Sequence, residues 1–540
     1  MSEPANEQKP QQVKMSMELV RQLQPALKEL GHDLPDAARL VPSVNLDLTV
    51  SELGLQLGGL LKNEGIFRMG DSRDLVTVDE STARIIPMSP ERFCSWVEKT
   101  VTTYKPKQGY SKDTTMGKDL AGKILNSDFF LAQLHQLHGV APVRMPARRG
   151  PREIELLPAG FDQATGVYCA DRVDYDLEMT VEAAREVFEE LLREFAFEGQ
   201  RGQIWSTRSS LVQVAAMLST YCRYLWPAGT TRPAIIWTAN QAGAGKSLLA
   251  YMILAFVYGD PGNAAVPPKE EEMIKLLDAV AQRRAPYLWL DDAPPAIFSK
   301  ALNKFILAPK HEGRVLGTPL TFEEPACTQV LVTGNALIIE RDLERRALIC
   351  ELFEAGEIED KKFDFELSPQ RLSGTELRAR VLAACWAIVR EWSVNECHQS
   401  TRRKPSFEAW SSDVVGMLEC LGVEGDVLGR PELAMGGDEE SQQWRELIIA
   451  IASEIDEDPE EEPEIITMDD VIDKARQMEL LCELVGSEGG KPVTDDRRRK
   501  LGRRLQRWRG RQLRDLRGRL FTFGQRRSNR QRGIVVTFEA

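Results

Sequence analysis

The chain has 540 residues, of which 42% are hydrophobic and 28% are charged, with 39 glycines and 29 prolines. This composition excludes collagen-like, fibrous and wholly disordered proteins, and the length predicts about three or four domains that each bury a core. The longest apolar run, Leu248 to Tyr258, is shorter than the roughly 18 to 20 residues that span a bilayer, so no membrane crossing is expected.

The first residues, MSEPANEQKPQQVK, lack the charged and then apolar order of a secretory signal, so we expect a cytoplasmic protein. Nine cysteines are scattered along the chain without a Cys-x-x-Cys pair, and only five histidines accompany them. This pattern predicts reduced, mostly buried thiols, and neither a disulfide framework nor a zinc module.

The net charge of −13 is distributed unevenly. The last fifty residues contain 17 Lys and Arg against 4 Asp and Glu, a local charge of +13, so the first 490 residues carry −26. A basic segment behind an acidic body predicts a polyanionic partner, and we expect DNA. RNA, an acidic partner protein and a soluble tail that only balances the acidic body remain the alternatives.

Five segments are expected in chain order. They are a flexible lead (1–50), an α+β domain of adaptor type (51–200), an α/β domain in which helices wrap a parallel sheet (201–400), a linker or lid (401–440) and a basic DNA-binding domain (441–540). In the second segment the runs IFRMG, LVTVD, IELL and GVYC predict strands, and Ser89-Pro90-Glu91 predicts a helix start. Eight acidic residues between Glu454 and Glu464 predict a solvated loop.

A phosphate-binding loop is the most specific motif. Residues 233–239 are typical of a buried strand, NQAGAGKS follows as the loop, and LLAYMILAFVY follows as a helix. Glycines let backbone amides approach phosphate oxygens, Lys246 reaches the β and γ phosphates, and Ser247 ligates Mg²⁺. The motif therefore predicts ATP and Mg²⁺ as cofactors. The expected nucleotide-binding residues are Asn240, Gln241, Ala242, Gly243, Ala244, Gly245, Lys246 and Ser247.

The loop departs from the usual pattern at its first position, where Asn240 replaces glycine. Asparagine tolerates a left-handed backbone better than most residues, so we expect the turn to survive this replacement.

Two later strands also end in polar residues. The apolar run 287–290 precedes Asp291, which we expect to hold Mg²⁺, and Asp292, which we expect to act as the general base for the attacking water. The strand 328–335 ends in Asn335, which is placed to orient the same water. Arg345 and Arg346 follow, and such arginines suit a finger donated to the γ-phosphate of a neighbouring subunit, with an ordinary surface ion pair as the alternative.

A hairpin is expected between these motifs, over residues 310–324, with its turn at Gly317-Thr318-Pro319. NQAGAGKS, YLWLDD, this hairpin, LVTGN and DLERR resemble, in that order, the ATPase core of AAA+ helicases of phages and mobile genetic elements. The same motifs are similar to those of viral superfamily 3 and minichromosome-maintenance helicases. The resemblance covers residues 230–350, and the run LLPAGFDQATGVYC at 156–169 resembles leader domains of such phage-type proteins.

The resemblance implies a P-loop AAA+ core that forms a hexameric ring, with ATP held between subunits. It implies that Asp292 and Asn335 act on their own subunit's nucleotide, and that Arg345 or Arg346 acts in trans. It also implies that the hairpin grips DNA through Lys310, His311, Arg314 and Thr318, and it places a second-sensor arginine at Arg378 or Arg380.

The basic C-terminal segment is expected to form a winged helix. Trp444, Ile448, Ile451 and Ile455 share one helical face, and Thr467-x-x-Asp470 predicts a capping box. A helix over residues 496–508 turns Leu501, Leu505 and Trp508 inward and leaves arginines outside, as a recognition helix does. LFTF and IVVTF flank GQRRSNRQRG as two strands of a wing. The expected DNA-binding residues of this segment are Arg503, Arg504, Arg507, Arg526, Arg527 and Arg530.

These observations predict an ATP-dependent DNA helicase or unwinding initiator of phage or mobile-element replication, acting on single-stranded or forked DNA, with a primase as a possible partner. An alternative keeps the ATPase as a switch, loader, or defence or regulatory protein that binds DNA without unwinding it. A third alternative is a structural DNA-binding module with a degenerate nucleotide pocket. Such a protein is expected in the cytoplasm of a bacterial host, encoded there or by a phage.

Overall fold

The protein is described here from a computed structural model. The described residues are 42–538, except 71, 108–109, 198–201, 241, 295, 298, 316, 336, 355–366, 424, 430, 432–438, 456–465, 487–491, 506–507, 509–511, 516, 518 and 528–531. Most of the predicted lead, most of the acidic loop, Gln241, Arg507 and Arg530 therefore lie outside the described residues. The side chains of Arg503, Arg526 and Arg527 lie outside them as well.

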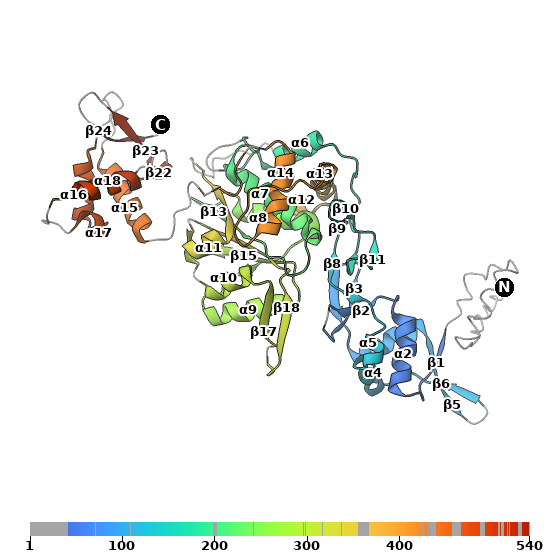
Figure 1. The fold of residues 1–540 in the computed structure, drawn as a ribbon. Helices are drawn as coiled ribbons and strands as arrows, with labels where there is room; N and C mark the ends of the chain where they lie inside the picture. The colour runs from blue at the N-terminus through green and yellow to red at the C-terminus, as the bar shows by residue number, and fades with distance from the viewer. Residues whose placement is uncertain are drawn as a thin grey trace, which may run out of the picture. The chain divides into compact units, whose positions relative to one another are not determined.

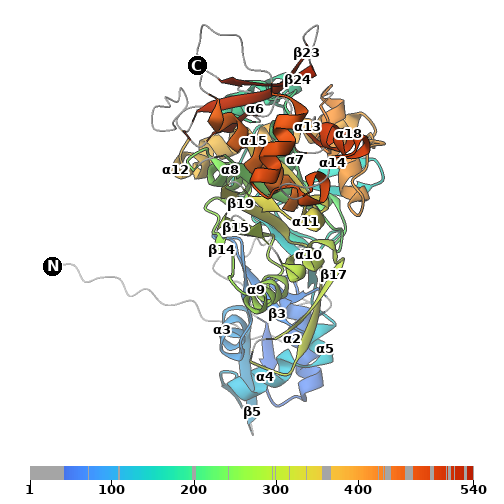
Figure 2. The same ribbon diagram turned by 90° about the vertical axis from the view of Figure 1, so that its left-hand side faces the viewer.

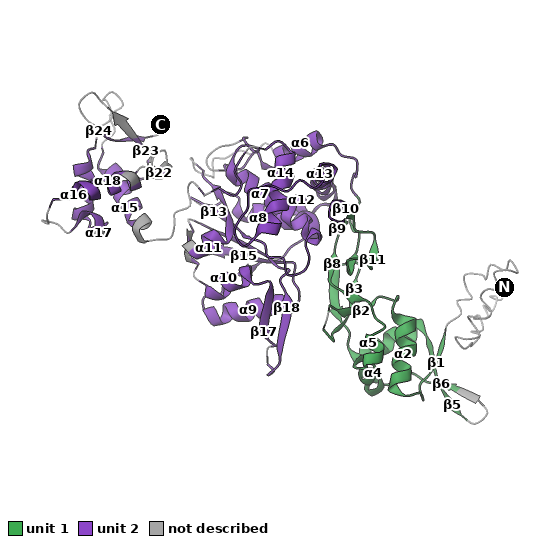
Figure 3. Ribbon diagram, in the orientation of Figure 1, with its two compact units in different colours: residues 1–147, 155–174 green, residues 148–154, 175–540 purple. Residues whose placement is uncertain are grey.

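The chain divides into two compact units (Figure 3). The first comprises the described residues up to Ala147 together with Glu155–Asp174, and the second comprises Arg148–Ile154 and the described residues from Tyr175 onward. Helix α6 (Val181–Leu192) belongs to the second unit, because it packs against α13 (Thr375–Val394). The division therefore falls before the boundary expected near residue 200.

The described residues of the first unit form an α+β assembly of three small sheets and four helices. Its strand orders are β4-β3-β2-β7, β11-β12-β8 and β1-β5-β6. Strands β2, β3 and β12, together with β10 (Glu153–Leu156), confirm the four strands predicted from IFRMG, LVTVD, GVYC and IELL, and Ser89 caps α3 as predicted. The strands are β1 (Ser43–Asn45), β2 (Ile66–Met69), β3 (Leu75–Asp79), β4 (Arg84–Pro87), β5 (Thr102–Lys107), β6 (Tyr110–Asp113), β7 (Gln136–Leu137), β8 (Gly139–Ala141), β11 (Gly160–Asp162) and β12 (Val167–Cys169).

The helices of the first unit enclose an apolar core in which the rings of Phe93 and Phe130 meet edge to face. These helices are α2 (Val50–Leu61), α3 (Pro90–Thr100), α4 (Lys118–Leu125) and α5 (Asp128–Leu131). The end of the segment expected as a flexible lead is part of this unit. Val44 of β1 is buried in the core, and β1 pairs with β5.

The second unit contains a five-stranded parallel sheet with the order β14-β15-β19-β13-β21 (Figure 1). This confirms the α/β class with a parallel sheet. Every residue of β13 and of β21 is buried, as expected for strands that helices cover on both faces. The strands are β13 (Ala234–Ala239), β14 (Ala264–Ala265), β15 (Tyr287–Ala293), β19 (Gln329–Asn335) and β21 (Ala347–Leu352).

Helix α8 (Lys246–Tyr258) lies against β13, β15 and β19, and α7 (Arg208–Tyr221) packs on both α8 and β21. Nearly all of α8 is apolar and buried, which is typical of a helix inside a core rather than on a surface. Helices α12 (Pro369–Ser373) and α13 pack on α8.

A hairpin extends from this domain next to two helices (Figure 2). Strands β17 (Lys310–Arg314) and β18 (Thr321–Pro325) pair antiparallel and confirm the predicted hairpin, with Gly317 at a φ of 77° in its turn. Helix α9 (Glu270–Gln282) contacts both strands and also α10 (Lys300–Leu307). Two short strands from separate parts of the chain, β16 (Ala296–Ile297) and β20 (Ile338–Ile339), pair parallel to each other.

The segment expected as a linker or lid contains a buried helix. Helix α14 (Glu408–Cys420) packs on α7 and α13, and the Trp410 side chain is fully buried. Asp413 is buried too, where its carboxylate accepts hydrogen bonds from Arg148 at 2.9 Å and Trp226 at 3.0 Å. Burial raises the pKa of Asp413, and Arg148 opposes that effect.

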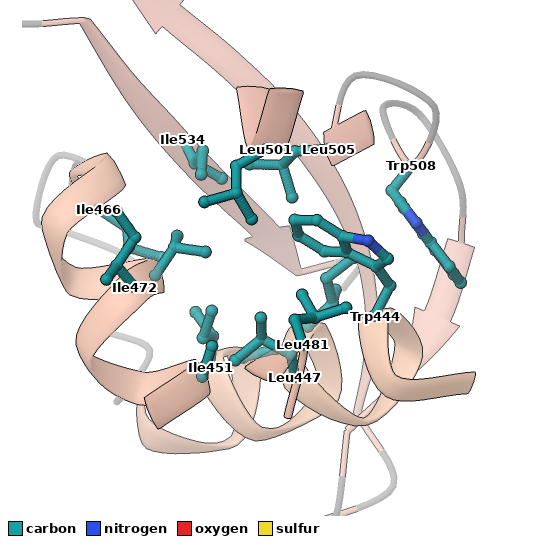
Figure 4. Packing of buried hydrophobic residues seen from close by; sticks show 14 of the residues in the cluster. Trp444, Leu447, Ile451, Ile466, Ile472, Leu481, Leu501, Leu505, Trp508 and Ile534 are labelled. Carbon is teal, nitrogen blue, oxygen red and sulfur yellow. The ribbon is translucent and has the colours of Figure 1, made fainter. Parts of the chain in front are cut away.

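The C-terminal segment has its own apolar core (Figure 4). Trp444, Ile448 and Ile451 are buried on one face of α15 as predicted, and Leu501, Leu505 and Trp508 are buried as predicted. Thr467 and Asp470 form the predicted capping box, and Ile466 bridges Ile534. The elements are α15 (Glu439–Glu454), α16 (Met468–Gln477), α17 (Cys482–Val485), α18 (Asp495–Leu505), β22 (Gln512–Arg514), β23 (Leu520–Arg527) and β24 (Arg532–Phe538), with β23 between β22 and β24.

Within the described ranges, no helix combines the length and the apolar character needed to span a bilayer. All nine cysteines are free thiols, and five of them are buried. Burial raises the pKa of Cys169 to about 11.

Candidate nucleotide-binding site

The phosphate-loop motif lies between the end of β13 and the start of α8, as its sequence predicts. Gly243 and Gly245 have φ angles of 81° and 94°, a left-handed conformation that glycine adopts without strain. A side chain at position 245 would also collide with the Phe195 ring, whose Cε1 would lie 2.6 Å from the added Cβ. The N-terminus of α8, which is the positive end of its helix dipole, lies at this loop.

Asn240 does not adopt the left-handed conformation that asparagine tolerates, because it is not among the residues with positive φ. Its side chain instead joins the loop to the end of β21. Asn240 Nδ2 donates to the carbonyl of Glu354 at 2.8 Å, and Asn240 Oδ1 accepts from the Glu354 amide at 3.0 Å. The side-chain amide thus pairs with the backbone of Glu354 as a second peptide group would, and glycine could not form these two hydrogen bonds.

Lys246 and Asn335 lie together at the carboxyl ends of β13 and β19. Lys246 Nζ donates to Asn335 Oδ1 over 2.5 Å, and the Lys246 side chain is almost fully buried, with 7% of the residue exposed. Burial lowers the pKa of Lys246, and the carboxylates of Asp292 and Asp291 oppose this shift. The two carboxylates thus offset part of the effect of burial on the ammonium.

The carboxylate of Asp291 is the centre of a hydrogen-bond cluster. Ser247 Oγ donates to Asp291 Oδ1 at 2.7 Å, Asn263 Nδ2 donates to Asp291 Oδ2 at 2.9 Å, and Thr333 Oγ1 donates to Asp291 Oδ1. Sequence reasoning missed Asn263 and Thr333. A signal for Thr333 existed, because it is a polar residue inside the apolar strand β19, two positions before Asn335.

Asp292 departs from the strand geometry of its neighbours. It has a φ of 51°, and the pairing of β15 with β19 is irregular between Leu290 and Ala293. The Asp292 amide donates to Thr333 Oγ1 at 3.2 Å, and its side chain is exposed at the strand end. Such a conformation costs about 1 to 3 kcal/mol in a non-glycine residue, and surrounding contacts must hold it.

Arg345 and Arg346 lie at the opposite edge of the sheet from the phosphate loop. They end α11 (Arg341–Arg345), and the Ala234 amide at the start of β13 donates to the carbonyl of Arg346. The loop begins at the other end of β13, which is about 17 Å away at roughly 3.3 Å per strand residue. Both arginines pair with Asp342, but the side chain of Arg345 is 72% exposed and that of Arg346 only 19%.

The hairpin residues expected to grip DNA have partners within the chain. Lys310 Nζ lies 2.6 Å from Glu323, His311 Nε2 lies 2.7 Å from Asp278 Oδ1, and Thr318 Oγ1 donates to the carbonyl of Val315 at 3.0 Å. Arg314 is exposed, and its backbone amide donates to Asp278. The DNA-binding roles of these residues stay predictions.

The two arginines suggested as a second sensor form hydrogen bonds or ion pairs with other elements. Arg378 caps the far end of α8, where Nη2 donates to the carbonyl of Val257 at 3.0 Å and Nε donates to that of Phe256 at 3.3 Å. Since α8 has 13 residues, Arg378 lies about 18 Å from the loop of its own chain, and its role as a second sensor stays a prediction. Arg380 pairs with Glu190 of α6 at 2.7 Å.

The basic surface of the C-terminal segment includes α18. Arg497, Arg499 and Lys500 are exposed there, Arg498 pairs with Asp469, and Arg504 is half-buried. Lys500 lies 3.0 Å from Asp496.

No protein-family model and no curated protein matches this chain. Among solved structures, the chain is similar to the apo C-terminal region of NrS-1, with 11% identity and a TM-score of 0.35, over 61% of this chain and 69% of that chain. It is also similar to an active helicase, Cch of SCCmec type IV, with 11% identity and a TM-score of 0.26, over 72% of this chain and 73% of that chain. Both TM-scores are below 0.5, so neither likeness establishes a shared fold or activity.

Proposed function

We propose that this chain is an ATP-dependent DNA helicase or unwinding initiator of phage or mobile-element replication. The observation that carries this proposal is the meeting of Lys246, Ser247, Asp291 and Asn335 at the carboxyl edge of one parallel sheet. In open α/β sheets, ligands bind at the carboxyl ends of the strands, at the point where the strand order reverses. The site thus combines a cation, a helix N-terminus and hard oxygen ligands, which suits a nucleoside triphosphate with its metal.

The residues present fit Mg²⁺. Ser247 Oγ and Asp291 Oδ1 are oxygen ligands 2.7 Å apart, and magnesium prefers one or two such protein ligands together with phosphates and water. When bound, Mg²⁺ would neutralise the charge that develops on the phosphate oxygens. Lys246 would hold the β and γ phosphates, Asn335 would orient the attacking water, and Asp292 would accept its proton.

The ring arrangement rests on where Arg345 lies. An arginine about 17 Å from its own loop, at the other end of β13, can act on a phosphate only in another subunit. We assign the trans finger to Arg345, because its side chain is exposed, whereas that of Arg346 is mostly covered. ATP would then be held between subunits of a ring, for which we propose a hexamer.

We assign a winged-helix role to the C-terminal segment. The order α15, Ile466, α16, α18, β23 and β24, with Ile466 bridging β24, supports that assignment. Helix α18 would be the recognition helix, and β23 and β24 would form the wing that carries Arg526, Arg527 and Arg530. Arginine-rich surfaces bind phosphates with little sequence preference, so we infer DNA binding of modest specificity.

The switch or loader alternative has one observation in its favour. Lys310 and His311 of the hairpin are already paired with Glu323 and Asp278, so the hairpin offers few cations to a phosphate chain. In this alternative, the protein hydrolyses ATP but does not move DNA.

Strand displacement on forked DNA separates the two functions. The helicase proposal expects ATP-dependent displacement by the wild-type chain and none by Lys246→Ala, run side by side. DNA-stimulated hydrolysis without displacement would favour the switch. A strictly monomeric chain in the presence of a non-hydrolysable ATP analogue and DNA would overturn the ring.

A further inference from the structure

The first unit contains a pocket that the proposed ATPase does not use. Its volume is about 390 Å³, and it lies between Arg68 of β2, the segment 131–138 and the turn that joins β11 to β12. This volume falls within the range of small-molecule sites, which is about 300 to 1,000 Å³. All of the residues that line it belong to the first unit.

The polar groups at this pocket favour an anion. Its lining contains the guanidinium of Arg68 and the imidazoles of His135 and His138, and none of the described lining residues carries a carboxylate. Arg68 Nε is buried and has no hydrogen-bond partner among the described residues. Because water does not reach this Nε, an oxyanion in the pocket would interact with the positive charge of the guanidinium and not with Nε itself.

A row of rings leads to the same pocket. The Phe67 and Phe161 centroids are 5.0 Å apart, and the Phe161 and His135 centroids are 5.1 Å apart, each pair tilted by less than 40°. Phe161 and His135 both line the pocket, and the His135 imidazole is only half-buried. A planar group bound there would extend this row, as bases do on aromatic side chains in proteins that bind single strands.

Hydrogen bonds hold the turn that borders the pocket. Asp162 accepts hydrogen bonds from the Thr165 amide at 3.2 Å and from Thr165 Oγ1 at 2.5 Å, so this nearby carboxylate is already used within the turn. Gly166 has a φ of 67°, and a Cβ there would lie 2.4 Å from His138 Cδ2. A preformed pocket binds its ligand with less loss of conformational entropy.

We propose that this pocket binds one nucleotide unit, with its phosphate at Arg68 and its base against His135 and Phe161. The unit is either a free nucleoside monophosphate or one residue of a single strand, since both present a phosphate and a base. The site is separate from the phosphate loop and does not depend on ATP hydrolysis.

Photo-crosslinking of the full chain tests this proposal. The Lys246→Ala variant, without Mg²⁺, removes the contribution of the phosphate loop, and 4-thiothymidine monophosphate or a 4-thiothymidine oligonucleotide serves as the probe. We expect labels on the tryptic peptides 124–144 and 153–172, which carry the two walls of the pocket. A mononucleotide that labels better than the oligonucleotide identifies a free nucleotide as the ligand, and the reverse identifies a strand.

Two variants make the test specific to the pocket. Arg68→Gln should reduce labelling of both peptides at least tenfold. His135→Ala should also reduce labelling, but it should change the concentration of inorganic phosphate needed to displace the probe less than Arg68→Gln does. Arg73→Gln is the matched control, because Arg73 is an exposed arginine of the same unit that pairs with Asp128. Thermal melting identifies any variant that fails to fold, and the second variant then carries the test.

Three results would overturn the proposal. They are no label in either peptide, equal labelling of the parent and Arg68→Gln, and displacement of the probe by inorganic phosphate as readily as by thymidine monophosphate. The last result would mean that the rings contribute nothing to binding.

Discussion

Lys246 and Asn335 are 89 positions apart in the chain, yet the Lys246 ammonium donates to Asn335 Oδ1 over 2.5 Å. The contact follows from the sheet, because β13 and β19 are parallel neighbours with Ala239 opposite Asn335. The group that we propose to hold the γ-phosphate thus contacts the amide that we assign to the attacking water.

We expect Lys246→Ala to lower ATP turnover by about 10²-fold or more, since a preorganised cation next to the transferred phosphate is lost. Asn335→Ala should lower turnover and leave nucleotide affinity nearly unchanged. Steady-state hydrolysis and nucleotide titration measure both effects. Lys275→Ala is the control, because Lys275 is exposed and pairs with Glu272 on its own helix. Wild-type turnover by Lys246→Ala would contradict the assigned site.

Thr333 is a positioning residue that the structure adds to the site. Its hydroxyl donates to the Asp291 carboxylate and accepts from the Asp292 backbone amide, so it holds the carboxylate of the first residue and the backbone of the second. Thr333→Val keeps the shape and removes the hydroxyl, and we expect the Mg²⁺ concentration for half-maximal hydrolysis to rise about 10- to 100-fold, as for other residues that orient metal ligands. Thr333→Ser should restore it, and Thr321→Val on the hairpin should have no effect. An unchanged Mg²⁺ requirement in Thr333→Val would remove Thr333 from the site.

Arg345 should act on the nucleotide of another subunit. Arg345→Ala and Lys246→Ala chains are each expected to be nearly inactive, but mixtures should recover part of the hydrolysis, because some interfaces then combine an intact loop with an intact finger. Arg346→Ala should instead lower the melting temperature, since Arg346 is mostly covered and pairs with Asp342. Failure of every mixing ratio to recover activity would exclude a finger in trans.

The basic face of α18 should contribute electrostatic affinity. Arg497 and Arg499 are both exposed, so we expect Arg497→Gln with Arg499→Gln to weaken binding of all DNA sequences alike. The slope of log affinity against log salt should decrease by about 2, since each phosphate contact contributes about 0.9. Fluorescence anisotropy at several salt concentrations measures the slope. The exposed Arg152, changed to Gln, is the control, and an equal loss of slope there would show that only net charge matters.

The elements around the site could be predicted because their signals are local. A continuous apolar run predicts β13, an all-round apolar run predicts α8, and polar residues at strand ends predict Asp291 and Asn335. The same reasoning identified the two strands of the hairpin and the inward face of α18. In each case the sequence pattern lies within one strand, or within a few helical turns, of the residue that it predicts.

The remaining features depend on contacts between distant parts of the chain. Asn240 bonds to a residue 114 positions away, so nothing near it in sequence shows its role. Thr333 and Asn263 meet Asp291 through the order and register of strands, which local patterns do not contain. Helix α14 was expected as part of a linker, because its stability comes from Trp410 packing into the second unit and not from a strong amphipathic pattern.

Lys404 provides a test of pH dependence away from the site. Burial lowers the pKa of Lys404 to about 8, with Arg208 lowering it further and Glu344 opposing the shift. Because an unfolded lysine has a pKa near 10.4, the unfolded chain binds more protons than the folded chain between about pH 8 and pH 10. Folding stability should therefore rise as the pH increases through this window, and Lys404 should destabilise the fold below it.

We expect Lys404→Met to remove this cost, which is about 3 kcal/mol at most from the size of the pKa shift. The variant should melt at a higher temperature than the wild type at pH 7, and the two should converge as the pH approaches 10. Thermal melting at closely spaced pH values measures both, with the exposed Lys300→Met as the control. A constant difference between Lys404→Met and wild type at every pH would show that packing, and not the buried charge, accounts for the effect.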